Sequence, residues 1–147
     1  MLSIDTNLLF YAYEASCPEH KAAYAFFSSL VEREDVAISE FVLVELYNLL
    51  RNPTVIERPL KSAEAVGVIQ SYRSHPAWRL LSFPDPGMPI MGQVWKRAAE
   101  PHFARRRIYD LRLALTLRSQ GVTEFATSNE KDFGELGFHR VWNPLDE

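Results

Sequence analysis

Hydrophobic positions along the chain fall into short apolar runs separated by longer stretches of helical period. Five short runs have the composition of strands, and they cover residues 2–5, 36–39, 78–83, 124–127 and 140–144. The helical stretches begin near Leu8 and then cover residues 18–34, 40–51, 62–75, 90–100 and 108–121. Short strands that alternate with amphipathic helices are typical of a parallel sheet covered on both faces. We therefore predict an α/β fold, a three-layer α/β/α sandwich with a mostly parallel central sheet.

The length and composition fit one folded unit. The chain has 147 residues, of which 47% are hydrophobic and 24% are charged, as in ordinary globular proteins. It contains no internal repeat and no linker long enough to separate two domains. We expect a single domain over residues 1–147.

No segment has the pattern of a membrane span or a secretion signal. The longest apolar stretches, such as EFVLVELYNLL, contain charges and fall short of the roughly 20 residues that cross a bilayer. The N-terminus lacks a basic region, and Asp5 interrupts its apolar run. We expect a cytoplasmic protein without a membrane partner. Its single cysteine, Cys17, excludes an intrachain disulfide and a cysteine-rich zinc site.

The charge balance changes the picture only locally. A net charge of −3, from 16 Lys and Arg against 19 Asp and Glu, argues against a broadly basic surface. The consecutive residues Arg105, Arg106 and Arg107 are the exception. Two interpretations stay open for them, a solvated helix face and a patch that binds phosphate.

Asp5 is an ionisable residue between a strand-like run and a helix-like run. Burying a lone carboxylate costs several kcal/mol unless it is paired, hydrogen-bonded or bound to a metal. The loop between a parallel strand and the next helix is also where α/β proteins bind ligands. Asp5 is therefore either the N-cap of the following helix or a ligand. The polar segment 127–132 follows another strand and is expected at the same edge of the sheet.

Two further acidic residues lie in predicted helices. Glu45 belongs to a helix that is apolar nearly all round, which predicts a buried helix with one carboxylate turned inward. Exposure at a helix edge and pairing with an arginine are the alternatives. Asp110 lies in the first turn of its helix, three residues after Arg107, and the helix dipole alone explains an acid there. If Asp5, Glu45 and Asp110 converge, their oxygens suit Mg²⁺ or Mn²⁺ and the hydrolysis of a phosphodiester.

Four segments, taken in order and spacing, carry a family resemblance. They are SIDTNLLFYA at the start, ISEFVLVELYNLL around Glu45, RRRIYDLRLALTLRSQGV around Asp110, and FATSNEKDF running into VWNPL. With these segments the chain resembles the PIN-domain ribonucleases of the VapC toxin type. The resemblance implies a parallel sheet with flanking helices and acidic residues gathered around Mg²⁺ or Mn²⁺. It also implies endonucleolytic cleavage of RNA, restraint by a cognate antitoxin protein, and a homodimer.

The resemblance assigns roles by position. Asp5, Glu45 and Asp110 match the three principal acidic places, with Asp5 and Asp110 as metal ligands. The fourth acidic place falls on Asn129, whose amide offers a carbonyl oxygen but no charge. A water activated by the metal would attack the scissile phosphorus and leave a 5′-phosphate and a 3′-hydroxyl. Supporting roles fall to Thr6 and Ser128, which would orient ligands or waters, to Asp132, which would compensate for Asn129, and to Arg105, Arg106 and Arg107, which would neutralise substrate phosphates.

Two other classes of protein also carry a functional aspartate after a strand. A haloacid-dehalogenase-type phosphatase needs a second aspartate two residues after the first, where this chain has Asn7. A receiver domain needs an acceptor aspartate after a middle strand, and VAISEF supplies none. A PIN-like module that binds RNA or an antitoxin with weak catalysis stays open because of Asn129.

Overall fold

The computed structural model describes residues 1–147 and contains one five-stranded sheet, in which every neighbouring pair of strands is parallel. The order across the sheet is β3-β2-β1-β4-β5. The strands are β1 (Leu2–Ile4), β2 (Val36–Ser39), β3 (Arg79–Leu81), β4 (Glu124–Ala126) and β5 (Arg140–Trp142). Each lies within one of the five predicted runs, so the predicted parallel α/β fold is confirmed.

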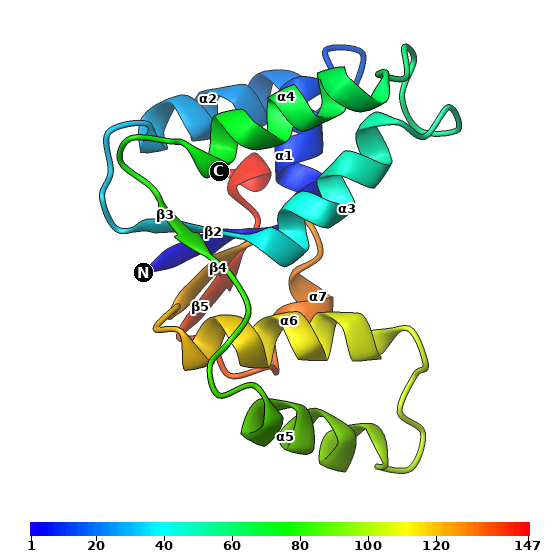
Figure 1. Ribbon diagram of the computed structural model, residues 1–147, viewed down its shortest axis with the longest axis vertical. Coiled ribbons are helices and arrows are strands. Elements are labelled where there is room, and N and C mark those ends of the chain that lie inside the picture. Colours follow the sequence, from blue (N-terminus) through cyan, green and yellow to red (C-terminus); the bar gives the residue numbers. More distant parts are fainter.

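Helices form a layer on each side of this sheet (Figure 1). Helices α1 to α4 lie above it in the view, and α5 and α6 lie below it, with α7 packed against α6. Their bounds are α1 (Thr6–Tyr13), α2 (His20–Leu30), α3 (Glu40–Leu50), α4 (Ser62–Arg73), α5 (Met88–Ala98), α6 (Arg107–Ser119) and α7 (Glu130–Phe133), followed by a 3-10 turn, η1 (Pro144–Asp146). No helix is long and apolar enough to cross a membrane.

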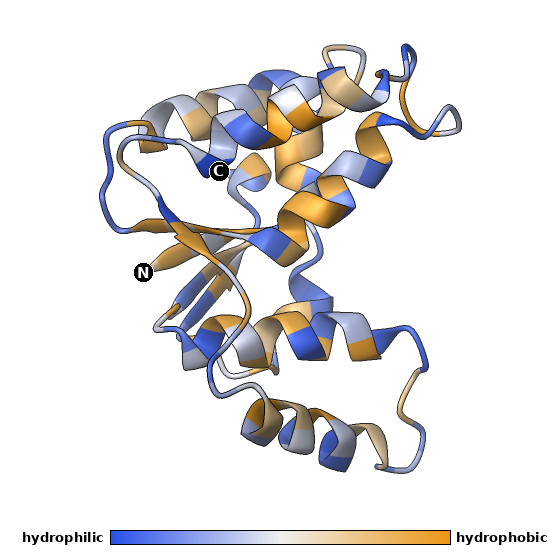
Figure 2. Cartoon of the chain, in the orientation of Figure 1, coloured by the Kyte–Doolittle hydropathy of each residue, from blue (hydrophilic) through white to orange (hydrophobic).

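The core lies between the sheet and the two helical layers. Strand β1 is buried along its whole length, and its one polar side chain, Ser3, donates a 2.8 Å hydrogen bond to the carbonyl of Ala37 on β2. Figure 2 shows β1 and β2 in hydrophobic colours, with helices around the sheet that mix hydrophobic and hydrophilic residues. Helix α3 covers the sheet with one stripe only, made of Val42, Leu43, Leu46 and Leu50.

The connections change sides at β1. From β1 the chain runs to β2 and β3 through α1 to α4 on one face, and it returns to β4 through α5 and α6 on the other face. Ligands of open α/β sheets bind outside the carboxyl ends of the strands at such a switch point. The residues that directly follow β1 and β4 there are Asp5 and Thr127, and the Asp5 amide donates to the carbonyl of Ala126 at 2.9 Å.

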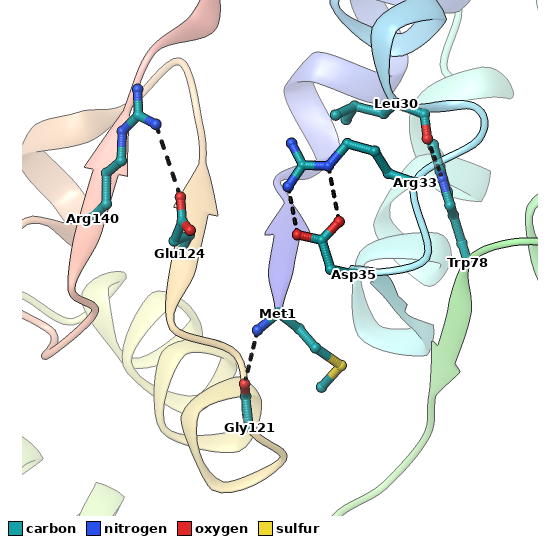
Figure 3. Close-up of polar contacts among 8 residues, drawn as sticks. All are labelled: Met1, Leu30, Arg33, Asp35, Trp78, Gly121, Glu124 and Arg140. Carbon is teal, nitrogen blue, oxygen red and sulfur yellow. Dashed lines mark hydrogen bonds and ion pairs between the residues drawn. The ribbon is translucent and has the colours of Figure 1, made fainter.

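Polar contacts also lie at the amino edge of the sheet, where the strands begin, opposite the carboxyl ends (Figure 3). The terminal ammonium of Met1 donates to the carbonyl of Gly121 at 3.3 Å, and the Trp78 indole donates to the carbonyl of Leu30 at 2.9 Å. Arg33 pairs with Asp35 in an exposed ion pair, which contributes little to stability. These contacts give this edge a structural role.

Some element boundaries differ from the sequence prediction. Helix α1 begins at Thr6 rather than near Leu8, because Asp5 caps it directly. The short helix α7 was not predicted, since four residues carry too little helical period. The predicted end of α6 is confirmed, because Gly121 takes the left-handed conformation, with φ of 92°, just after the helix.

Candidate active site

Asp5 is the buried centre of the carboxyl edge. Only 7% of its surface is exposed. Its Oδ1 accepts a 2.8 Å hydrogen bond from the amide of Thr6, and its Oδ2 accepts a 2.7 Å bond from Oγ1 of Thr127. Burial raises the pKa of Asp5 to about 6 against the lowering effect of these two bonds, and the Glu45 and Asp132 carboxylates raise it further. Asp5 is thus an N-cap, as one reading of the sequence has it, in surroundings that disfavour its charge.

Asp110 lies in the first turn of α6 and is half-buried. Its pKa is raised to about 6, first by burial and then by the carboxylates of Asp132, Asp5 and Glu45. Arg107 lowers this pKa, but its effect is the smallest of those that act on Asp110. The two residues form no ion pair. The predicted position in the first turn is confirmed, but the arginine does not neutralise the acid.

Glu45 corrects a prediction. The sequence predicts an inward, buried carboxylate on α3, whereas Glu45 is exposed and its neighbour Val44 is 67% exposed. The prediction is wrong because only one stripe of α3 packs on the sheet, and Glu45 lies beside that stripe. Its Oε2 still accepts a 2.9 Å hydrogen bond from Oγ1 of Thr6, which fixes it at the rim beside Asp5.

The loop after β4 brings in the remaining residues of segment 127–132. The Asn129 amide donates to Oγ1 of Thr127 at 3.0 Å, and the Asp132 amide donates to the carbonyl of Asn129 at 3.0 Å. Asn129 and Asp132 have exposed side chains, while Ser128 is half-buried. Among the charged groups, Asp132 raises the pKa of Asp110 the most. It therefore belongs to the acidic group.

None of these acids forms an ion pair within the protein. The four ion pairs of the structure involve other carboxylates, those of Asp35, Glu40, Glu124 and Glu147. No three His, Cys, Asp or Glu side chains lie close enough together to hold a metal ion by themselves. Unbalanced carboxylate oxygens in an open arrangement fit a hard cation that keeps several of its waters, as Mg²⁺ does. We call Asp5, Glu45, Asp110 and Asp132 the acidic centre.

A basic rim borders the acidic centre. Arg106, Arg107 and Lys131 line a pocket of about 370 Å³ together with Asp110 and Asp132. Arg105 is exposed and does not line it. Of the three predicted arginines, two therefore face the site, and Lys131 joins them.

Sequence reasoning did not assign a role to two of the residues at this edge. Thr127 donates a hydrogen bond to Asp5, and its place directly after a buried strand could have indicated this role from the sequence. Tyr11 of α1 lies close enough to Ser128 and Asp5 for both to affect its pKa, which burial raises. Nothing in the sequence distinguishes Tyr11 from the other aromatic residues near the N-terminus, so it could not be found there.

Comparison with known proteins agrees with this architecture. Residues 2–139 match the PIN domain family. Two proteins named Ribonuclease VapC24, from the Mycobacterium tuberculosis strains CDC 1551 / Oshkosh and ATCC 25618 / H37Rv, are each 54% identical over 145 residues, which is 99% of this chain and 97% of the relative.

Solved structures share the fold at lower identity. M. tuberculosis VapC20, described as a Sarcin-Ricin loop cleaving toxin, has a TM-score of 0.67 and 19% identity, over 94% of this chain and 96% of that one. FitAB bound to the IR36 DNA fragment has a TM-score of 0.65 and 20% identity, over 99% and 96%. VapBC2 from Rickettsia felis, bound to a DNA fragment from their promoter, has a TM-score of 0.65 and 17% identity, over 97% of this chain and 98% of that one.

Fold and site together define a parallel α/β protein with an open acidic centre at its topological switch point. The chain belongs to the PIN domain family, among the ribonucleases of the VapC type.

Proposed function

We propose that the protein is an endoribonuclease that hydrolyses RNA phosphodiester bonds with the help of Mg²⁺ or Mn²⁺, as the toxin of a toxin–antitoxin pair. The observation that carries the proposal is the acidic centre, in which no carboxylate forms an ion pair and two carboxyl groups have a pKa raised to about 6. Unpaired charges of like sign cost stability, and such clusters occur at functional sites.

Asp5 and Asp110 would hold the cation, with Glu45 and Asn129 at the edge of its shell. When bound, the ion lowers the pKa of water and stabilises the charge that develops on the phosphoryl group. Both aspartates must be ionised to bind it. The amide of Thr6 and the hydroxyl of Thr127 keep the two oxygens of Asp5 in fixed directions.

The other residues act on the water and on the substrate. Thr6 engages Oε2 of Glu45, so Oε1 is the oxygen that would take up the proton of the attacking water. Arg106, Arg107 and Lys131 would neutralise phosphates beside Asp110. In this arrangement the acidic centre handles the scissile phosphate, and the basic rim handles its neighbours.

The partners extend this proposal. We infer a cognate antitoxin protein, a homodimer and a cytoplasmic location. The 54% identity to proteins named Ribonuclease VapC24 supports the antitoxin partner, because the VapC resemblance implies one. A catalytically weak PIN-like module that binds RNA or the antitoxin is the second candidate. The uncharged Asn129 favours it, whereas the acidic centre counts against it.

The decisive experiment is cleavage of labelled RNA by the purified, antitoxin-free protein with Mg²⁺ or Mn²⁺. EDTA, Asp5→Asn and Asp110→Asn are the controls, each checked for folding by circular dichroism. Cleavage that needs the metal and disappears in both variants supports the nuclease. Folded protein that binds the metal but cuts neither single-stranded nor structured RNAs would instead favour the binding module.

A further inference from the structure

A second polar pocket includes Asn129 in its lining and shares no residue with the pocket of the basic rim. Its volume is about 480 Å³, within the range of roughly 300–1,000 Å³ found for small-ligand pockets. Its polar lining comes from α1, from the loop before α2, from the loop after β4 and from the C-terminal turn, and consists of Tyr11, Glu19, Ser128, Asn129, Asn143 and Asp146. We call it the Tyr11 pocket. The C-terminal turn, red in Figure 1, packs against α2.

The charge of the Tyr11 pocket is opposite to that of the basic rim. No Lys or Arg lines it, and two of its side chains, Glu19 and Asp146, are carboxylates. A phosphate would meet like charges here, whereas beside Asp110 it meets Arg106, Arg107 and Lys131. The Tyr11 pocket is therefore suited to a neutral part of a polynucleotide rather than to its backbone.

The charged hydrogen-bonding groups of the Tyr11 pocket, Glu19 and Asp146, are acceptors only. Asn143 is fully engaged as a cap, because its Oδ1 accepts from the amide of Leu145 at 3.1 Å and its Nδ2 donates to Oδ2 of Asp146 at 3.1 Å. Oδ1 of Asp146 and both carboxylate oxygens of Glu19 have no partner within the protein, and neither has the side-chain amide of Asn129. Carboxylates accept hydrogen bonds from the exocyclic amino groups of bases.

The Tyr11 ring supplies the flat surface that such a ligand needs. It is half-exposed at the pocket, and an aromatic side chain that stacks on a base contributes about 1–3 kcal/mol to single-strand binding by alanine substitution. Its backbone is fixed, since the ring nitrogen Nδ1 of His20 lies 2.9 Å from the Tyr11 carbonyl. Stacking depends little on which base is bound, so the carboxylates of Glu19 and Asp146 are the groups that distinguish between bases.

We propose that the Tyr11 pocket binds a nucleobase that carries an exocyclic amino group, that is adenine, cytosine or guanine, and discriminates against uracil. Resting on the proposed ribonuclease function, the base belongs to a nucleotide next to the scissile phosphate, and the pocket sets the preferred cut site. The RNA then runs from the basic rim across the acidic centre to Tyr11. Glu19 and Asp146 are the residues that determine specificity.

The first arm of the test measures binding without cleavage. Adenosine, cytidine, guanosine and uridine are titrated separately into metal-free protein, and the backbone amides of Ser128 and Asn143 are followed by NMR. The expected result is saturable shifts with the three amino-bearing nucleosides and a dissociation constant about tenfold weaker for uridine. Absence of shifts with all four nucleosides, or equal affinity for uridine, would overturn the proposal.

The second arm measures the choice of cut site in an RNA pool randomised around one cleavable position. Wild type should cut with uridine disfavoured by about tenfold at one flanking nucleotide, and the double variant E19Q/D146N should lose most of that discrimination. Glu34→Gln, which removes one negative charge at an exposed position next to Asp35 and outside the pocket, is the control for a change of charge alone and should keep it.

The two arms separate the failure of this inference from the failure of the proposed function. If wild type cuts no RNA but binds the amino-bearing nucleosides, the base pocket stands and the nuclease function falls. If wild type cuts RNA and E19Q/D146N has the same base preference, the nuclease stands and the specificity role of the Tyr11 pocket is refuted. If Glu34→Gln alters the base preference as much as E19Q/D146N does, the specificity role of the Tyr11 pocket is refuted as well.

Discussion

Oγ1 of Thr127 donates a 2.7 Å hydrogen bond to Oδ2 of Asp5, across the point where the connections of the sheet change sides. Thr127 is fully buried and Asp5 nearly so. The bond joins the ends of β1 and β4 and favours the ionised form of Asp5 where burial disfavours it. It is therefore a structural contact and an electrostatic one.

Removal of this donor should affect both roles. In Thr127→Val the side chain keeps its shape but loses the hydroxyl, so we expect the pKa of Asp5 to rise above that of wild type and the free energy of unfolding at pH 8 to fall by about 1–3 kcal/mol. Urea denaturation and NMR titration of the Asp5 carboxyl measure the two effects. Thr127→Ser, which keeps the hydroxyl, should stay close to wild type; equal behaviour of the two variants would contradict this role.

The acidic centre predicts an unusual pH dependence of stability for the metal-free protein. The pKa values of Asp5 and Asp110 are raised from 3.8 to about 6, so between these pH values the folded state holds protons that the unfolded chain has lost. Their contribution to the free energy of unfolding therefore falls as the pH rises from about 4 to 6, by up to about 3 kcal/mol for Asp5 and by less for the half-exposed Asp110. Urea denaturation in EDTA at pH 4.5 and pH 7, compared between wild type and Asp5→Asn, isolates the effect. A difference between the two proteins that does not change with pH would contradict it.

Neutralising Asp110 should stabilise the fold while it abolishes cleavage. Asp110→Asn removes one of four neighbouring negative charges, so in EDTA at pH 8 the melting temperature should rise by about 2–4 °C, which corresponds to roughly 1 kcal/mol for a chain of this size. Differential scanning calorimetry measures the change. Asp85→Asn, at an exposed position outside the acidic centre, is the control that should leave the melting temperature unchanged.

Divalent metal should reverse the repulsion. Mg²⁺ or Mn²⁺ at about 100 times its dissociation constant should stabilise wild type by about 2.7 kcal/mol at pH 8, and by much less at pH 5, because protons compete for the aspartates. Asp5→Asn should lose this stabilisation, whereas Asn129→Asp should bind the metal more tightly than wild type through its added charge. Thermal melts at several metal concentrations test both variants. Stabilisation of Asp5→Asn equal to that of wild type would exclude Asp5 as a ligand.

The basic rim should appear in the salt dependence of RNA binding. Arg106→Ala and Arg107→Ala, made in an Asp110→Asn background that does not cut, should each reduce the slope of log K against log salt by about 0.7, the value for one phosphate contact on a single strand. Arg105→Ala should change the slope less, because Arg105 does not line the pocket. The exposed Arg58 serves as the remote control. Equal effects of all four substitutions would indicate non-specific attraction only.

The sequence was informative about the sheet because each strand is a short apolar run whose two faces are covered. It was less informative about α7, whose four residues carry no periodic signal. Glu45 was misjudged for a related reason, since a helix rich in apolar residues can still leave Val44 and Glu45 in solvent when only one stripe packs.

The acidic centre was predictable only in part. Asp5, Glu45 and Asp110 were singled out from their places in the predicted elements and given roles by the family resemblance, but the approach of Asp132 depends on the turn that Asn129 and Asp132 close after β4. The Tyr11 pocket collects residues from four separate segments, and no local spacing reveals such a combination. Its existence follows from the tertiary structure alone.

The contact between Asp5 and Thr127 also has a temporal meaning. The two residues are 122 positions apart, so at about 5–20 residues per second the ribosome adds Thr127 roughly 6–24 s after Asp5. During that interval one edge of β1 lacks its neighbour β4, and the carboxylate of Asp5 lacks its hydroxyl donor. The order of synthesis thus delays assembly of the acidic centre until Thr127 and Asp132, in the last seventh of the chain, have been added.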